Sequence, residues 1–127
     1  MNLLIDTHVL LWMMFEPEKL SKKVKQILEN TKNIVNVSYL SLWEIAVKVK
    51  IGKLEIKMAF EDIVENIENQ GIIFLPIEKK HISETINLEL HHRDPFDRML
   101  IAQSKVENLT MITKDNNFSK YDINIIW

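Results

Sequence analysis

The segment from His92 to Gln103 reads HRDPFDRMLIAQ and has the features of a helix start. Proline has a fixed φ and no N–H to donate, so Pro95 is expected at the first helical position, with Asp94 as the N-cap and Asp97 in the first turn. An N-cap aspartate accepts hydrogen bonds from unpaired backbone N–H groups, and a second acid nearby complements the helix dipole. A structural role is therefore sufficient to explain both acids.

Two other aspartates point to a functional alternative. Asp6 and Asp115 each follow a short apolar run that predicts a buried strand. In a parallel sheet, functional sites lie outside the carboxyl ends of the strands, where both acids fall. Asp97 joins them if its helix turns back directly into the strand before Asp115. If the helix begins far from that edge, Asp97 is only a cap.

Short apolar strands alternate with amphipathic helices along the whole chain. The alternation predicts the α/β class, a mostly parallel five-stranded sheet covered by helices on both faces. A chain of 127 residues is expected to form a single domain over residues 1–127. The expected strands are 3–5, 33–36, 72–75, 109–112 and 123–126, and the expected helices are 8–15, 21–28, 38–51, 58–69, 79–90 and 95–108.

Composition narrows the classes of function. Hydrophobic residues make up 46% of the chain and charged residues 27%, as in an ordinary globular protein, which argues against a disordered or fibrous chain. With a net charge of -2, any nucleic acid must be met by a local basic rim or through metal ions. The absence of cysteine excludes disulfides and thiolate chemistry and is compatible with a reducing cytosol.

The first apolar run, 3–15, is neither a signal peptide nor a membrane span. It carries Asp6 and His8 and has no basic region before it. We therefore expect a cytoplasmic protein with no membrane contact.

Glu44 lies in one of the most apolar helices of the chain. One interpretation is a surface ion pair with Lys48 one turn later, in the favoured order of acid before base. The other is an inward-facing carboxylate that a cation or hydrogen bonds must match. The spacing alone favours neither interpretation.

The four acids Asp6, Glu44, Asp97 and Asp115 would be costly to bring together. Two carboxylates about 5 Å apart at an effective dielectric of about 20 repel by roughly 3 kcal/mol. A converged cluster should therefore hold a cation or be partly protonated. Oxygen ligands suit Mg²⁺ or Mn²⁺, and such an ion activates water against a phosphodiester.

Four motifs also occur in the order seen in a known family. They are LIDTHVLLW at 4–12, SLWEIAVK at 41–48 followed by Gly52-Lys53-Leu54, HRDPFDR at 92–98, and ITKD at 112–115. In these motifs the chain resembles PIN domains, and among them the VapC-like toxins of type II toxin-antitoxin systems. The resemblance covers essentially the whole chain.

The resemblance implies a compact α/β/α sandwich with a Mg²⁺- or Mn²⁺-dependent endoribonuclease site. Asp6, Glu44, Asp97 and Asp115 match the family's acidic quartet of catalytic metal ligands, and Thr113 matches a hydroxyl residue often found beside the last acid. Asp94 is not one of the four and stays a helix cap near the site. The implied partners are an RNA substrate, a small cognate antitoxin protein and a second copy of the chain.

The chain departs from the family pattern around two of its acids. His8 stands where many members have a small polar residue, and Asn116 and Asn117 supply no further acid after Asp115. The number of metal ions, one or two, therefore stays open.

Basic, imidazole and apolar side chains supply further candidates. Arg98 and Lys114 adjoin predicted ligands and, with Thr113, are candidates for substrate binding. Lys48, Lys50, Lys53 and Arg93 complete a candidate basic rim, although a solvated face is the commoner fate of such residues.

His81, His91 and His92 have no zinc-motif spacing and are expected at the surface. The apolar run 12–15 is either core or a surface for a dimer or antitoxin.

Three classes of function fit these patterns. The first is the metal-dependent ribonuclease toxin. The second is a phosphoryl-transfer or phosphoacceptor domain with Asp6 as nucleophile, although His8 stands where the usual phosphatase signature has a second acid. The third is a non-catalytic interaction module whose acids are caps and ion-pair partners.

Overall fold

The computed structural model describes residues 1–127 and contains one five-stranded sheet with the order β3-β2-β1-β4-β5. All four strand pairs are parallel. The strands are β1 (Asn2–Ile5), β2 (Ile34–Ser38), β3 (Ile73–Leu75), β4 (Thr110–Ile112) and β5 (Ile125–Ile126). The helices are α1 (Thr7–Phe15), α2 (Lys22–Glu29), α3 (Tyr39–Lys50), α4 (Phe60–Asn69), α5 (Lys79–Asn87) and α6 (Pro95–Glu107), and the 3-10 turns are η1 (Pro17–Lys19) and η2 (Phe118–Lys120).

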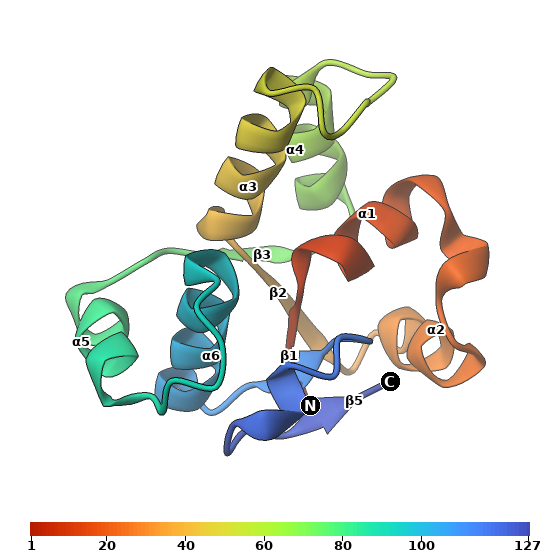
Figure 1. The fold of residues 1–127 in the computed structure, drawn as a ribbon. Coiled ribbons are helices and arrows are strands. Elements are labelled where there is room, and N and C mark those ends of the chain that lie inside the picture. The colour runs from red at the N-terminus through yellow and green to blue at the C-terminus, as the bar shows by residue number, and fades with distance from the viewer.

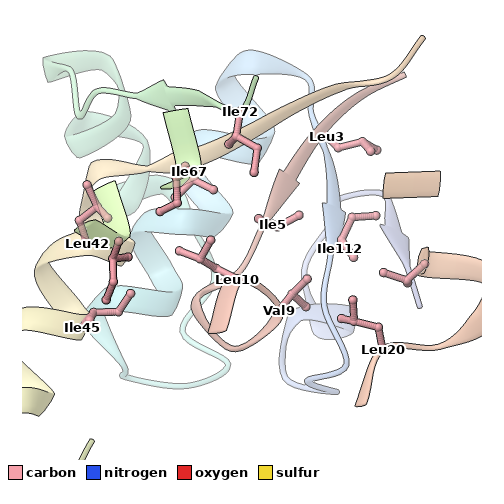
Figure 2. Close-up of a cluster of buried hydrophobic side chains, with 13 residues drawn as sticks. Leu3, Ile5, Val9, Leu10, Leu20, Leu42, Ile45, Ile67, Ile72 and Ile112 are labelled. Carbon is pink, nitrogen blue, oxygen red and sulfur yellow. The ribbon is translucent and has the colours of Figure 1, made fainter. Parts of the chain in front are cut away.

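Helices cover both faces of the sheet, so the predicted three-layer α/β/α sandwich is confirmed. Figure 1 shows α1 to α4 and the pair α5 and α6 in different parts of the molecule around the strands. Side chains alternate across β1: Leu3 and Ile5 pack in a cluster with residues of α1 to α4, whereas Leu4 packs in a second cluster with residues of α6. Figure 2 shows the first cluster, where Ile5 of β1 lies near Leu10 and Val9 of α1. No helix has the length and apolar character needed to cross a bilayer.

The strand order reverses at β1, which has β2 on one side and β4 on the other. Crossovers of one hand then place the helices after β1 and β2 on one face and those after β3 on the other. At such a reversal the chain leaves neighbouring strands in opposite directions, which opens a crevice at their carboxyl ends. The residues that follow Ile5 and Ile112 lie at this crevice.

Helix α6 begins and ends as its sequence predicts. The Asp94 side chain accepts a hydrogen bond from Asp97 N at 3.0 Å, and Pro95 is the first helical residue. Asn108 ends the helix with φ of 53°, the left-handed conformation that asparagine tolerates. Ser104 Oγ donates to Leu109 O at 2.7 Å, so the chain turns back at once into β4. This short reversal returns the start of α6 to the edge where β4 ends.

Four predicted boundaries differ from the structure by two residues or more. The strand expected at 33–36 ends at Ser38, and the helix expected at 58–69 begins at Phe60. The helix expected at 79–90 ends at Asn87, and the strand expected at 123–126 is only the pair Ile125–Ile126. Leu88 is extended and packs in the second core cluster, while the Arg98 guanidinium donates to Thr85 O and Leu88 O. A distant cation therefore satisfies carbonyls at the end of α5, which local sequence does not reveal.

We predict that Asp94→Ala lowers the free energy of unfolding by about 1 kcal/mol, because Asp97 N loses its hydrogen-bond acceptor. Urea denaturation at pH 7.5 measures this loss. Asp94→Asn is the matched control and should be nearly neutral, since asparagine caps helices as well as aspartate does. An equal loss in both variants would show that the charge of Asp94, and not its cap, carries the stability.

Candidate active site

Asp6 is the most constrained acid of the site. It follows β1 as the N-cap of α1, and only 4% of the residue is exposed. Its Oδ1 accepts from Val9 N at 2.7 Å, and its Oδ2 accepts from the Thr113 hydroxyl. Burial raises the pKa of the Asp6 carboxyl above its ordinary value, while these hydrogen bonds oppose the rise and the negative charge of Asp115 adds to it.

Thr113 joins the ends of β1 and β4. Its hydroxyl donates to Asp6 and accepts from Asp115 N at 3.0 Å. Asp115 is exposed, and its Oδ1 accepts from Asn117 N at 2.9 Å, which orients the carboxylate after the strand. The hydroxyl expected to bind substrate therefore positions two acids in this structure.

Asp97 lies in the first turn of α6 with 24% of its side chain exposed. Burial, together with the charge of neighbouring Asp94, raises the pKa of Asp97 to about 6, and Asp115 adds to the rise. His92 opposes it, with Nε2 at 3.4 Å from Asp97 Oδ2. Asp115 is thus the common electrostatic neighbour of Asp6 and Asp97.

Glu44 of α3 is buried, with 8% exposed, and both interpretations of its spacing are correct: it forms an ion pair and it faces inward. Its Oε2 lies 2.8 Å from Lys48 Nζ, and its Oε1 accepts from the Thr7 hydroxyl at 2.6 Å. Thr7 directly follows Asp6 and is also hydrogen-bonded to Ser41 Oγ at 3.0 Å. Glu44 is therefore tied to the first aspartate through its neighbour, and Lys48 neutralises its charge.

Two adjoining hollows lie at this edge. The acidic hollow has a volume of about 350 Å³ and is lined by Asp6, His8, Trp12, Lys114 and Asp115. The lysine hollow, about 240 Å³, shares His8 and Trp12 with it, and its lining also includes Lys48, Lys53, Leu54 and Ile56. Trp12 packs edge-on against Trp127 with ring centroids 5.7 Å apart, which holds the wall between the hollows in place.

The carboxylate oxygens at this edge are of the type that hard divalent ions bind. Asp6, Asp97 and Asp115 present carboxylate oxygens, and burial is the main cause of the raised pKa values of Asp6 and Asp97, with the charge of Asp115 adding to both. However, no three acidic or imidazole side chains lie close enough together to form a ready metal site. As the side chains stand, Lys48 and Thr7 hold Glu44, and Thr113 and Val9 N hold Asp6. The assignment of Asp6, Glu44, Asp97 and Asp115 as metal ligands stays a prediction.

Comparison with known proteins identifies the family. The family model described as PIN domain matches residues 3–124. The chain belongs to the PIN domain family. PIN domains are nucleases, which places the protein among the hydrolases in general. No curated protein matches the chain at the level of sequence.

Solved structures share the fold of this PIN domain. VapBC2 from Rickettsia felis, bound to a promoter DNA fragment, gives a TM-score of 0.75 at 13% identity and covers 99% of this chain and 98% of that chain. FitAcB from Neisseria gonorrhoeae gives 0.66 at 19% identity, covering 100% and 97%. VapBC-5 of the VapBC family of toxin-antitoxin systems, from Mycobacterium tuberculosis, gives 0.63 at 18% identity, covering 98% and 97%.

The predicted basic rim is only partly available in the PIN domain. Arg98 was expected to bind substrate, but its guanidinium donates to backbone carbonyls of Thr85, Leu88 and Glu89 and to Tyr121 Oη. Its donors are used inside the protein, which argues against a direct contact of Arg98 with substrate. Lys114 and Lys53, in contrast, line the two hollows.

Two predictions about side-chain environment also need correction or completion. His81 is fully buried and not at the surface, because its Nδ1 accepts from Glu78 N at 3.0 Å at the start of α5. The run 12–15 is largely core: Trp12, Met13 and Met14 pack against the first cluster, and Phe15 is exposed. Sequence reasoning missed Tyr121 and the contact of His92 with Asp97, since nothing in the spacing relates position 121 to position 92.

We predict that Asp97→Asn stabilises the metal-free protein at pH 7.5, by at most about 3 kcal/mol, because the partly exposed Asp97 must ionise at a cost. The raised pKa means that the folded state holds this proton more tightly, so the stability that Asp97 contributes is present below about pH 4 and is lost as pH rises through about 6. Urea denaturation in EDTA from pH 4 to pH 8 measures the difference.

The control for this prediction is Asp62→Asn, which changes an exposed acid in the first turn of α4. It should slightly destabilise, because an acid complements the helix dipole there. If Asp97→Asn is no more stable than the wild type at pH 7.5, charge repulsion does not govern Asp97.

Proposed function

We propose that this PIN domain is a Mg²⁺- or Mn²⁺-dependent endoribonuclease that cleaves single-stranded or structured RNA and acts as the toxin of a toxin-antitoxin pair. The observation that supports the proposal is that Asp6 and Asp97, whose pKa values burial raises, share Asp115 as a charged neighbour at the carboxyl edge of the sheet. Three neighbouring carboxylates repel one another when ionised, which lowers the stability of the folded protein. A divalent cation bound between them would reduce this repulsion.

In this proposal Asp6, Asp97 and Asp115 hold the metal. A bound ion would supply Lewis-acid activation of a water molecule and of the phosphodiester. Thr113 keeps Asp6 Oδ2 and the Asp115 backbone in a fixed relation, and Val9 N fixes Asp6 Oδ1. The chain thereby orients two acids before any ligand arrives, which reduces the reorganisation that binding requires.

Glu44 takes a conditional role in the proposed site. Lys48 neutralises it at 2.8 Å, so it becomes a ligand only if that ion pair opens. We propose that Glu44 acts with the other three acids as the fourth catalytic carboxylate once its contacts with Lys48 and Thr7 open.

The phosphoryl-transfer alternative has less support from the geometry. An aspartate that attacks phosphorus must give up the hydrogen bond on its attacking oxygen, whereas a metal ligand can keep it because each carboxylate oxygen has two lone-pair sites. Both oxygens of Asp6 accept hydrogen bonds, and the residue is buried. Capping explains Asp6 and Asp94 in the non-catalytic alternative, but it does not explain the raised pKa of Asp97.

The two hollows provide a path for an RNA strand. Proteins that bind single strands combine basic grooves with aromatic surfaces on which bases stack. Lys114 lies beside the acids, His8 and Trp12 form the shared wall, and Lys53 lies in the lysine hollow. We propose that the strand crosses the acidic hollow and continues past Trp12 into the lysine hollow, with a phosphate near Lys53.

We predict that Lys53→Ala weakens binding of single-stranded RNA and reduces the slope of log K against log salt concentration by about 0.7, the value for one lost phosphate contact. Fluorescence anisotropy in EDTA, which prevents cleavage, measures the slope. Lys57→Ala is the control, since Lys57 is exposed and lines neither hollow. Equal slopes for the two variants would move the strand away from the lysine hollow.

We predict that Asp6→Asn, Asp97→Asn and Asp115→Asn each lose RNA cleavage by orders of magnitude, and that a second such change adds little because the acids act as a unit. Asparagine keeps the N-cap of α1, so Asp6→Asn should still fold. Single-turnover cleavage of single-stranded RNA with Mn²⁺ measures the loss. Asp94→Ala is the control and should lose far less; near-normal cleavage by Asp97→Asn contradicts the assignment.

A small cognate antitoxin and a second copy of the chain are the proposed protein partners. The similarity in fold to chains of VapBC structures supports the first. Exposed apolar side chains support protein contacts more generally: Trp43 of α3 is 60% exposed, and Ile82 and Ile86 of α5 are 52% and 83% exposed.

A further inference from the structure

His92 lies between a buried tyrosine and an acid of the candidate active site. Its Nδ1 is 2.7 Å from Tyr121 Oη, and its Nε2 is 3.4 Å from Asp97 Oδ2. The two rings meet edge-on with centroids 5.5 Å apart, and 14% of the His92 side chain is exposed. The imidazole therefore has a polar partner at each nitrogen.

The contact with Arg98 favours Tyr121 as the donor to His92. A guanidinium has donors and no acceptor, so at 3.2 Å Arg98 Nη1 donates to Tyr121 Oη. The phenol keeps its own proton to donate, and its nearest acceptor is His92 Nδ1. Tyr121 is 7% exposed, so few other acceptors compete for that proton.

The tautomer of His92 follows from this direction. If Nδ1 accepts from Tyr121, the proton of a neutral imidazole is on Nε2, which faces Asp97. The opposite tautomer would place a nitrogen lone pair against an ionised carboxylate and leave the Tyr121 hydroxyl without an acceptor. Two independent contacts thus favour the same proton position.

We propose that Arg98, Tyr121 and His92 form a hydrogen-bond relay that positions the Asp97 carboxylate, with His92 Nε2–H donating to Asp97 Oδ2. This inference rests on the proposed function for its consequence, because orienting Asp97 is useful only if Asp97 binds a ligand. His92 and Tyr121 are positioning residues, since they act through Asp97. Groups of this kind orient metal-binding carboxylates and tune their affinity.

The relay is anchored away from the site. Arg98 also donates to Thr85 O, Leu88 O and Glu89 O, at 2.9, 3.3 and 2.9 Å, which fixes the end of α5 and the segment leading to His92. Arg98 and Asp97 are adjacent on α6, so the same helix start carries the first and last members of the relay. The carboxylate and the groups that orient it therefore belong to one packed unit.

Imidazole ¹⁵N NMR of the metal-free protein at pH 8 tests the proton position directly. The chain has four histidines, and the spectrum of His92→Gln identifies the His92 signals by their loss. We expect a protonated Nε2 and an unprotonated, hydrogen-bonded Nδ1. In Tyr121→Phe the Nδ1 signal should move to that of a nitrogen without a hydrogen bond. A protonated Nδ1 in the wild type overturns the proposal.

Mn²⁺ titration by calorimetry tests whether the relay acts through Asp97. His92→Leu should weaken Mn²⁺ binding by roughly tenfold or more, as loss of such a group typically does, and His92→Gln should restore part of the loss because its amide can donate. Tyr121→Phe should weaken binding in the wild type and add nothing in the His92→Leu background. An equal effect of Tyr121→Phe in both backgrounds overturns the relay.

Two matched controls change a histidine and a tyrosine that are not members of the relay. His91→Gln changes the adjacent histidine, whose Nε2 lies 3.0 Å from Glu89 and whose ring packs edge-on against Tyr121 with centroids 4.9 Å apart, so it tests ring packing on Tyr121 without the hydrogen bond. Tyr39→Phe changes the other tyrosine, which stacks on Phe74. Both should leave Mn²⁺ binding unchanged. If the wild type binds no Mn²⁺, the proposed function fails, and the ¹⁵N spectra still decide whether the relay exists.

Discussion

The hydrogen bond from the Thr113 hydroxyl to Asp6 Oδ2 joins the ends of two adjacent strands across the reversal in strand order. It gives a buried carboxylate a partner that carries no charge, so the negative charge stays in the site. The same hydroxyl accepts from Asp115 N, which places the next acid beside the first. The contact gives the buried Asp6 carboxylate a hydrogen-bond partner, and in the proposed chemistry it leaves the charge of that carboxylate available to a cation.

The acids at this edge of the sheet differ in how far their negative charge is neutralised. Lys48 neutralises Glu44, hydrogen bonds alone satisfy Asp6, and Asp97 has a pKa raised to about 6. Burial is the largest cause of the raised pKa of both Asp6 and Asp97, so ionising either acid in the folded protein costs free energy. The charge of Asp115 adds to both pKa rises, so a cation at this edge would stabilise the ionised forms of these acids.

Arg98 connects the fold to the site. Its guanidinium holds carbonyls after α5 and the hydroxyl of Tyr121, while its backbone belongs to the helix that carries Asp97. A residue that looks in sequence like a phosphate ligand is therefore an internal support. The lysines that line the hollows, Lys53 and Lys114, are left to meet an anionic substrate.

The sequence by itself determined the class of fold, the Asp94 cap of α6 and the placement of Asp6 and Asp115 after strands. Asp94-Pro95 predicts the start of α6 because proline and an acidic cap act locally, and apolar runs before Asp6 and Asp115 predict strands because burial follows side-chain pattern. Tertiary structure alone decided that Lys48 and Thr7 hold Glu44, that Arg98 is internal, and that Tyr121 reaches His92. These contacts join residues distant in sequence or depend on side-chain direction, which local propensity does not encode.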